Sequence, residues 1–249
     1  MFADIRVALS AYGEAIELSR KLNLWKFYFI PALISLLLAG LIGWAAFGWA
    51  SNIGDWLSGW YPWERGRGVV DTLGSLMGGL LVLALGLILY KNLVMIFAGP
   101  FMSPLSEKVE THISGIPTGK GLNVAQFTSD LVRGIQIGIR NILRELLYTL
   151  ILLLVGLIGI VAPITTLGIF LVQSYYAGFG NMDYTLERHY RLKGSVQFIR
   201  RHKGLAMGNG VVFMGLLLTG IGFLIAPPLS TVAATIATVR RLEQEDRPV

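Results

Sequence analysis

The 249-residue sequence contains no cysteine, and only 14% of its residues are charged. Without cysteine, disulfides and thiolate chemistry are excluded, and the redox compartment cannot be inferred. A soluble domain carries about a quarter charged residues, so this chain has too little polar surface for one. Hydrophobic residues make up 54% of the chain, and the mean hydropathy is +0.62. These values indicate an integral membrane protein.

Charge is missing altogether from three long runs, Phe27–Gly54, Leu146–Met182 and Gly204–Val239. A fourth uncharged run, Thr72–Tyr90, resumes after the single Lys91. Windows of about 18 or more apolar residues without charge are typical of membrane spans. Lipid admits only helices or closed barrels, and these runs do not alternate in polarity as barrel strands do. The predicted fold class is therefore an all-α integral membrane protein.

The net charge of +6 reflects the topology of the chain. All Lys and Arg except Arg65, Arg67 and Lys91 lie before Phe27, in residues 99–145, in residues 180–203, or in the tail after Val239. The positive-inside rule makes these four regions cytoplasmic. Both termini are then expected in the cytoplasm of a bacterial inner membrane, and nucleic-acid binding is a poor second interpretation. Mixed charge precedes the first apolar run, so we expect no cleaved signal peptide.

The N-terminal segment, residues 1–26, is predicted to be interfacial. Its apolar side chains recur at spacings of three and four, as on one face of a helix: Phe2, Ile5, Leu9, Tyr12 and Ile16. A helix lying in the membrane interface has this pattern, and so does a cytoplasmic helix packed on its own protein. Both interpretations stay open.

Two long transmembrane helices are predicted at residues 27–50 and 69–98. Pro31 falls in the first turn of the first helix, where a missing N–H costs little, and Gly99-Pro100 is expected to end the second. Lys91 lies near the cytoplasmic end of the second, where its side chain can snorkel to the headgroups. Between the helices lies an aromatic cluster that fits a headgroup belt or a partner surface: Trp56, Trp60, Tyr61 and Trp63.

The last two apolar runs, residues 146–179 and 205–239, are predicted to be helical hairpins. Proline interrupts each run near its middle, at Pro163 in one and at Pro227 and Pro228 in the other, and proline breaks a helix. Arms of about 15–17 residues reach roughly 23–26 Å, slightly less than the ~30 Å hydrocarbon core. Full crossing and partial penetration both stay open. Such turns line a binding cavity in transporters, or are kinks buried between helices.

Three cytoplasmic segments complete the predicted organisation: a helical region at 99–145, a basic segment at 180–204 and a tail at 240–249. Glu107 and Glu110 share a helix face. We expect them to brace this side by pairing with arginines, or to gate an entrance; the candidates are Arg133, Arg140 and Arg144. The basic stretch from Arg200 to Lys203 is expected to contact anionic headgroups or to attract anions.

No enzymatic motif is found. The three histidines, His112, His189 and His202, are scattered and form no metal-ligand spacing, and no nucleophile elbow or phosphate-binding glycine loop is present. We expect no enzyme activity, no cofactor and no metal. The apolar runs contain essentially no carboxylate, so a buried proton relay is not supported.

Three segments carry a family resemblance: Gly99–Glu110, Asp183–Tyr184 followed by Arg188–His189, and Ala226–Pro227. With them the sequence resembles the CysZ sulfate permease family, whose wider group includes the etoposide-induced membrane proteins. The resemblance implies two long membrane helices, hairpins that penetrate only partly, and dimers or higher oligomers.

The resemblance also implies an anion site at the start of the first membrane helix. The family motif there is G-[LI]-R-R followed by an aromatic residue, and it aligns with Asn23, Leu24, Trp25 and Lys26. Asn23 replaces the glycine, Trp25 replaces the first arginine, and Lys26 keeps the second basic position. We expect a permease or channel for sulfate or another small anion, with membrane lipid and further copies of the chain as partners. A non-transporting scaffold or assembly factor and a lipid-interacting protein are the alternatives.

Overall fold

The computed structural model of residues 1–249 describes residues 1–59, 67–117, 124–220 and 222–245, and the side chains of 45–84 and 118–126 are outside this description. The predicted aromatic belt, Trp56 to Trp63, therefore lies outside the described side chains. The described residues form helices and turns, with no strand among them. The helical fold class is thus confirmed.

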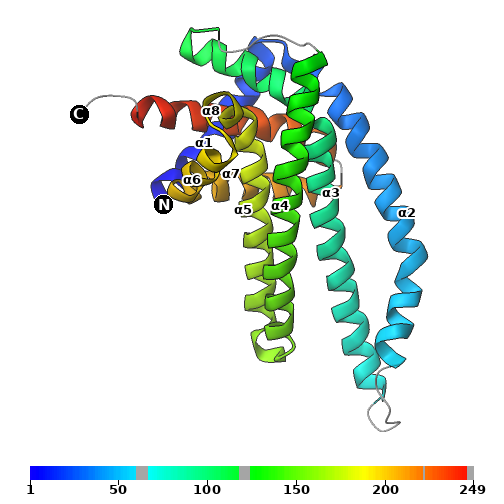
Figure 1. The fold of residues 1–249 in the computed structure, drawn as a ribbon. Coiled ribbons are helices and arrows are strands. Elements are labelled where there is room, and N and C mark those ends of the chain that lie inside the picture. The colour runs from blue at the N-terminus through cyan, green and yellow to red at the C-terminus, as the bar shows by residue number, and fades with distance from the viewer. Residues whose placement is uncertain (60–66, 118–123, 221, 246–249) are drawn as a thin grey trace.

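Eight helices and three 3-10 turns follow one another along the described chain. In order they are α1 (Phe2–Lys21), η1 (Leu24–Phe27), α2 (Phe29–Gly59), α3 (Arg67–Ser114), α4 (Val124–Gly156), η2 (Gly159–Val161), α5 (Ala162–His189), α6 (Leu192–Arg201), α7 (Lys203–Leu217), η3 (Gly222–Leu224) and α8 (Ala226–Glu245). The pairs α2–α3 and α4–α5 form two hairpins that point the same way (Figure 1). Helices α1, α7 and α8 lie at the opposite end, across the long axis of the hairpins, and this end also holds the start of α1 and the end of α8.

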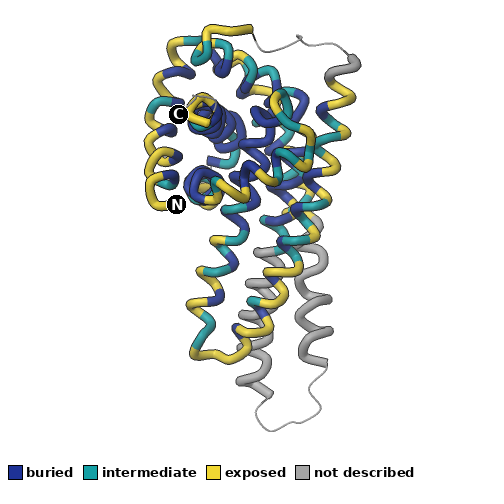
Figure 2. Tube along the Cα trace, turned by 60° about the vertical axis from the view of Figure 1, so that its left-hand side comes forward, coloured by how far each residue is buried: buried dark blue, intermediate teal, exposed yellow. Residues whose placement is uncertain are grey.

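Three described helices are long and apolar enough to cross a membrane, Leu24–Trp44, Leu85–Ser114 and Gly159–His189. The tip of the α4–α5 hairpin is largely exposed (Figure 2), and its exposed side chains are apolar: Ile160 is 87% exposed and Ile164 is 71% exposed. Water would disfavour such a surface, whereas lipid would not. The molecule is therefore built as a helical membrane protein.

Proline acts differently at different places in the chain. Pro31 and Pro163 lie in the first turns of α2 and α5, where no backbone hydrogen bond is lost. The expectation that Gly99-Pro100 ends the second membrane helix is wrong, because α3 continues through Pro100 and Pro104 to Ser114. Each proline removes one hydrogen bond and bends the helix, and Figure 1 shows the segment beyond them turned aside. This segment is held in place by a buried apolar face: Met102, Leu105 and Val109.

The predicted second hairpin lies inside the protein. Its two arms are α7 and α8, and Pro227 and Pro228 fall in the first turn of α8 rather than at the end of the first arm. Every residue of α8 from Ala226 to Val239 is buried, because α1, α3, α5 and α7 pack around it. The run lacks charge because it forms the core of the bundle. A helix that is apolar on all sides suits a protein core as well as a membrane, so composition alone did not separate the two.

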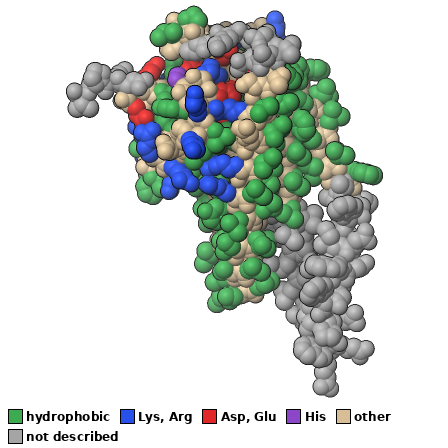
Figure 3. All heavy atoms as spheres, in the orientation of Figure 1, with side chains coloured by type: hydrophobic (Ala, Val, Ile, Leu, Met, Phe, Trp, Pro, Cys, Tyr) green, Lys and Arg blue, Asp and Glu red, His purple; other side chains and the backbone are tan. Residues whose placement is uncertain are grey.

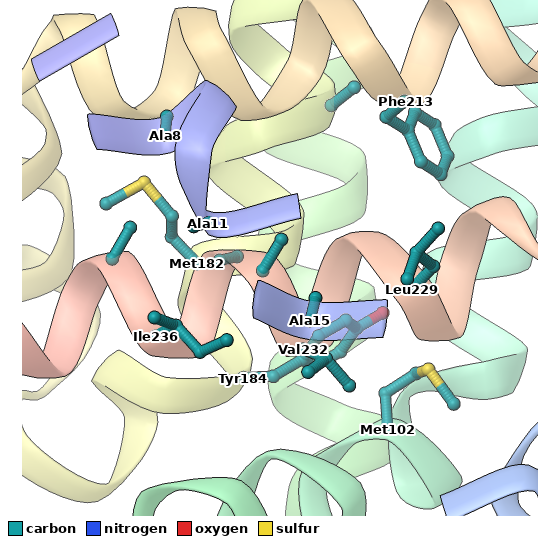
Figure 4. Close-up of a cluster of buried hydrophobic side chains, with 14 of the residues drawn as sticks. Ala8, Ala11, Ala15, Met102, Met182, Tyr184, Phe213, Leu229, Val232 and Ile236 are labelled. Carbon is teal, nitrogen blue, oxygen red and sulfur yellow. The ribbon is translucent and has the colours of Figure 1, made fainter. Parts of the chain in front are cut away.

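Helix α1 has one face on the protein and another exposed. Small side chains at Ala8, Ala11 and Ala15 are buried against α7 and α8, and Figure 4 shows Ala15 beside the core residue Val232. Phe2, Leu9 and Ile16, spaced by seven, stay exposed. The buried face agrees with a helix packed on its own protein, whereas the interfacial position of α1 stays a prediction.

Candidate functional site

The turn between α1 and α2 contains the residues aligned with the family's anion site. Asn23 adopts the left-handed conformation there, with φ 49° and ψ 51°, and is the one non-glycine residue with positive φ in the described chain. Asparagine is among the few L-residues that tolerate this conformation, because its short side chain bonds locally. The replacement of the motif's glycine by Asn23 therefore keeps a backbone geometry that glycine would readily supply.

The other residues of this turn divide into an anchor and an exposed pair. Leu24 is completely buried and fixes η1 to the core, whereas Trp25 is 47% exposed and Lys26 is also exposed. The indole of Trp25 packs against Tyr28, with ring centroids 4.9 Å apart. Lys26 thus lies at the surface at the base of the first candidate span, where an anion in solution can reach it.

A second cation, Lys108, reaches the same turn from α3. Its ammonium group donates a hydrogen bond to the Leu22 carbonyl at 3.2 Å and lies 5.8 Å from the Phe27 ring centroid. Two lysines therefore lie at this turn, Lys26 within it and Lys108 in contact with it. Sequence reasoning missed Lys108, although it belongs to the family-like segment that begins at Gly99.

Glu110 is braced, but by different partners from those expected. Arg188 donates from Nε to Glu110 Oε2 at 2.6 Å and from Nη2 to Ser106 Oγ at 2.7 Å. His189 Nε2 lies 2.5 Å from the other oxygen, Oε1, and Glu110 is only 2% exposed. The bend in α3 brings Glu110 to the end of α5, away from the arginines of α4. Glu107 is half-buried and forms no ion pair within the described residues.

Arg133 joins α4 to α5 and α6. Its guanidinium forms two parallel hydrogen bonds to the Asp183 carboxylate, each 2.9 Å long, and donates a third to Ser195 at 2.8 Å. Such bidentate pairs combine energy with fixed geometry. This arginine therefore braces the bundle, through a partner that lies in the second family-like segment.

The family-like segments at 99–110 and 183–189 interlock in space. Ser103 donates a hydrogen bond to Glu187, and Tyr184 donates one to the Met95 carbonyl at 2.8 Å. Ser106 and Thr185 are joined at 3.0 Å, and Thr235 of α8 bonds to both. The polar groups in these contacts are buried or partly buried, and each has a hydrogen-bond partner. Such an arrangement fits a structural joint better than a gate.

Arg140 and Arg144 do not take part in this joint. The Arg140 guanidinium carbon lies 4.8 Å from the Phe179 ring centroid, and Nη1 donates to the Asn141 side chain at 2.9 Å. Arg144 forms no ion pair in the described part of the chain and lines a surface groove. The predicted pairing of these two residues with Glu107 or Glu110 is therefore absent among the described contacts.

Lys91 lies inside the protein, and the expectation that it snorkels is wrong. Its ammonium group lies 2.8 Å from Glu145 Oε2, with both side chains 0% exposed, and it also donates to the Gln173 carbonyl at 2.8 Å. Asn92 donates to the same carboxylate oxygen at 3.3 Å. Glu145 directly precedes an apolar run, which was the available signal for a buried carboxylate. Mutual compensation of the two charges makes their burial tolerable.

The proline turns do not form a polar cavity in the described chain. The residues around Pro163 are apolar and open to the surroundings, with Leu157 66% exposed and Ile158 63% exposed, whereas Pro227 and Pro228 are buried in the core. Among the residues that the structure describes, no group of three His, Asp or Glu side chains could hold a metal ion. The proline turns therefore give no support to an anion cavity, and the turn at Asn23–Lys26 stays the anion site that the family resemblance implies.

The membrane-suited helices and the polar joint at one end define the class, a helical membrane protein. A family model described as sulfate transporter CysZ/etoposide-induced protein 2.4 matches residues 11–228, and the chain belongs to this family. The match confirms the resemblance found in the sequence and includes the Asn23 turn and both interlocked segments. A comparison with curated proteins finds no match.

Proposed function

We propose that the protein is a permease or channel for sulfate or another small inorganic anion in the bacterial inner membrane, with both termini in the cytoplasm. The observation that carries the proposal is the turn at Asn23–Lys26, in which Asn23 adopts the left-handed conformation and Lys26 is exposed, with Lys108 in contact with the turn. Hydrogen bonds between an ammonium group and an oxyanion are charge-assisted and stronger than neutral ones.

The residues at this turn favour a broad anion selectivity. Trp25 stands where the family motif has arginine, so the planar fork that binds an oxyanion through two hydrogen bonds is missing. Lysine acts as a compact point charge instead. We therefore propose weaker discrimination among small oxyanions than two arginines would give.

The proposal includes a homo-oligomer. Within one chain, the crevice lined by Asn92, Asp130 and Asp183 offers about 20 Å³, which is room for about one water molecule. This crevice is too small for a five-atom oxyanion, and we propose that the pathway runs along a surface shared between copies. The exposed apolar side of α2, which includes Leu33 and Leu37, is available for this contact. The mass of the detergent-solubilised protein, measured by light scattering, checks this part: a monomer would contradict it.

Radiolabelled sulfate uptake into proteoliposomes tests the function. We expect uptake above that of empty liposomes, and a fall of about tenfold in Lys26→Ala, the factor that corresponds to about 1.4 kcal/mol. Lys108→Ala should reduce uptake in the same direction. Lys193→Ala is the matched control, because Lys193 is exposed on α6 and forms no ion pair in the described chain; it should transport normally.

No enzymatic step, cofactor or metal is part of this proposal. Folded protein that takes up neither sulfate nor phosphate above the level of empty liposomes would contradict it. A membrane scaffold or assembly factor would then be the favoured function. A protein that co-purifies in stoichiometric amount would support that alternative.

A further inference from the structure

A large basic groove opens beside the α4–α5 hairpin, well separated in sequence from the Asn23 turn. It has a volume of about 610 Å³, and its polar lining comes from four helices: Arg144 and Tyr148 of α4, Tyr175 of α5, Arg200 of α6 and Lys203 of α7. Among the described residues that line it there is no Asp or Glu. We call this surface the basic groove.

The three cations of the basic groove lack acidic partners in the described chain. Arg144, Arg200 and Lys203 form no ion pair there, although the neighbouring Arg201 and His202 both pair with Glu245. Arg140 adds to the crowding, because it is repelled by Arg144 and Arg200. Positive charges gathered without a carboxylate repel one another and attract anions.

The basic groove lies where the apolar hairpin leaves the polar end of the bundle. Figure 3 shows Lys and Arg side chains gathered directly above the apolar surface of the hairpin. From Arg144 to Gly156, α4 rises by twelve residue steps, or about 18 Å, close to the roughly 15 Å of one leaflet's hydrocarbon. Exposed apolar side chains continue down this length, including Ile151, Leu154 and Leu167.

Tyrosine side chains mark the level of the boundary. Tyr148 lies four residues after Arg144, on the same side of α4, and is 47% exposed. The rings of Tyr175 and Tyr176 pack edge to face with centroids 5.1 Å apart. Tyrosine is enriched at membrane interfaces, because its ring is apolar and its hydroxyl is polar.

We propose that the basic groove binds the phosphate headgroup of an anionic phospholipid, whose acyl chains lie along the α4–α5 hairpin. The charge of the groove selects a headgroup with net negative charge, and the apolar surface below it accepts the chains. A free phosphate ion shares the headgroup chemistry but makes no use of that apolar surface. This site does not depend on the anion permease function, since its residues lie outside the Asn23 turn.

Native mass spectrometry of the delipidated full-length protein in detergent tests the proposal. Phosphatidylglycerol should bind more tightly than phosphatidylcholine. In Arg144→Gln/Arg200→Gln, phosphatidylglycerol binding should weaken by about fivefold for each cation removed, whereas phosphatidylcholine binding should not change. The control Arg201→Gln/Lys193→Gln removes the same charge outside the groove and should bind phosphatidylglycerol as the unmodified protein does.

The melting temperatures of the lipid-free variants show whether a loss of lipid binding is caused by unfolding. Arg144→Gln/Arg200→Gln removes like-charge repulsion, so its melting temperature should equal or exceed that of the unmodified protein. Equal affinity for the two lipids, or unchanged phosphatidylglycerol binding in the groove variant, would overturn the proposal. Displacement of phosphatidylglycerol by millimolar inorganic phosphate would also overturn it, because the groove would then be a site for free oxyanions.

Discussion

Lys91 Nζ lies 2.8 Å from Glu145 Oε2, and neither side chain has any exposed surface. Glu145→Gln keeps the shape of the side chain but leaves the lysine charge without its counter-charge. Breaking a buried pair in this way costs about 3–5 kcal/mol. For a chain of this size we expect the melting temperature in detergent to fall by roughly 6–20 °C.

The double variant Lys91→Met/Glu145→Leu is the control for this prediction. Replacing both charges by apolar side chains of similar volume is often neutral or stabilising, so the double variant should melt near the unmodified protein. If it melted as low as Glu145→Gln, shape rather than charge would determine the loss.

Gly210 allows the close crossing of α5 and α7. A Cβ atom added there would overlap the Ser174 carbonyl oxygen, whereas a Cβ at Gly215, on the same helix, meets nothing within 4 Å. Gly210→Ala should therefore lower stability by about 1–3 kcal/mol through overpacking. Gly215→Ala should leave it unchanged or raise it by up to about 1 kcal/mol. Melting curves of the two variants, measured side by side, check the contrast, and equal shifts would contradict it.

The contribution of Arg188 to stability depends on its planar guanidinium group. This group donates hydrogen bonds to Glu110 and Ser106 and to the Tyr184 carbonyl. Arg188→Lys keeps the charge but loses this geometry, so we expect a loss of at least about 1.5 kcal/mol. Arg201 is 59% exposed in its pair with Glu245, and Arg201→Lys should stay within about 0.5 kcal/mol. Thermal unfolding monitored by intrinsic fluorescence compares the two.

Tyr12 is predicted to make the stability depend on alkaline pH. Its hydroxyl donates to the Asn209 carbonyl at 2.8 Å and lies 2.7 Å from the Ser230 hydroxyl, which can donate to it. Burial raises the pKa of Tyr12 well above the ordinary value of 10.0. Above pH 10 the unfolded chain releases this proton while the folded protein keeps it. Stability is therefore complete below pH 10 and falls as pH rises, with a slope of up to about 1.4 kcal/mol per pH unit.

Tyr12→Phe removes that contribution and should show a shallower loss of melting temperature above pH 10. At neutral pH the variant should be less stable by about 1–3 kcal/mol, because the buried Asn209 carbonyl and Ser230 hydroxyl lose the tyrosine hydroxyl as a partner. Parallel pH curves for the two proteins would contradict the assignment to Tyr12.

The left-handed conformation of Asn23 should make the stability of the protein sensitive to substitution at this position. Asn23→Ala forces an ordinary L-residue into the left-handed region at a cost of about 1–2 kcal/mol. Asn23→Gly should be neutral, because glycine adopts this conformation freely. The melting temperatures of the two variants test the backbone argument, and their sulfate uptake tests whether the same geometry matters for transport.

The sequence allowed the helical membrane class and the family to be predicted, because long uncharged runs and local motifs are visible in one dimension. It did not reveal which helices pack together. Glu110 pairs with Arg188 because α3 bends at its prolines, and Lys91 is buried because Glu145 faces it from α4. The uncharged run of α8 belongs to a protein core, which has the same composition as a membrane span.

The contact of α1 with α7 and α8 orders the events of biosynthesis. Helix α1 is made before α7 and α8, so it can dock only after Lys203 and the residues beyond it have been made. At about 5–20 residues per second, roughly 10–40 s separate these two moments. During that delay the alanine face of α1 lacks the α7 and α8 surfaces that cover it in the folded protein.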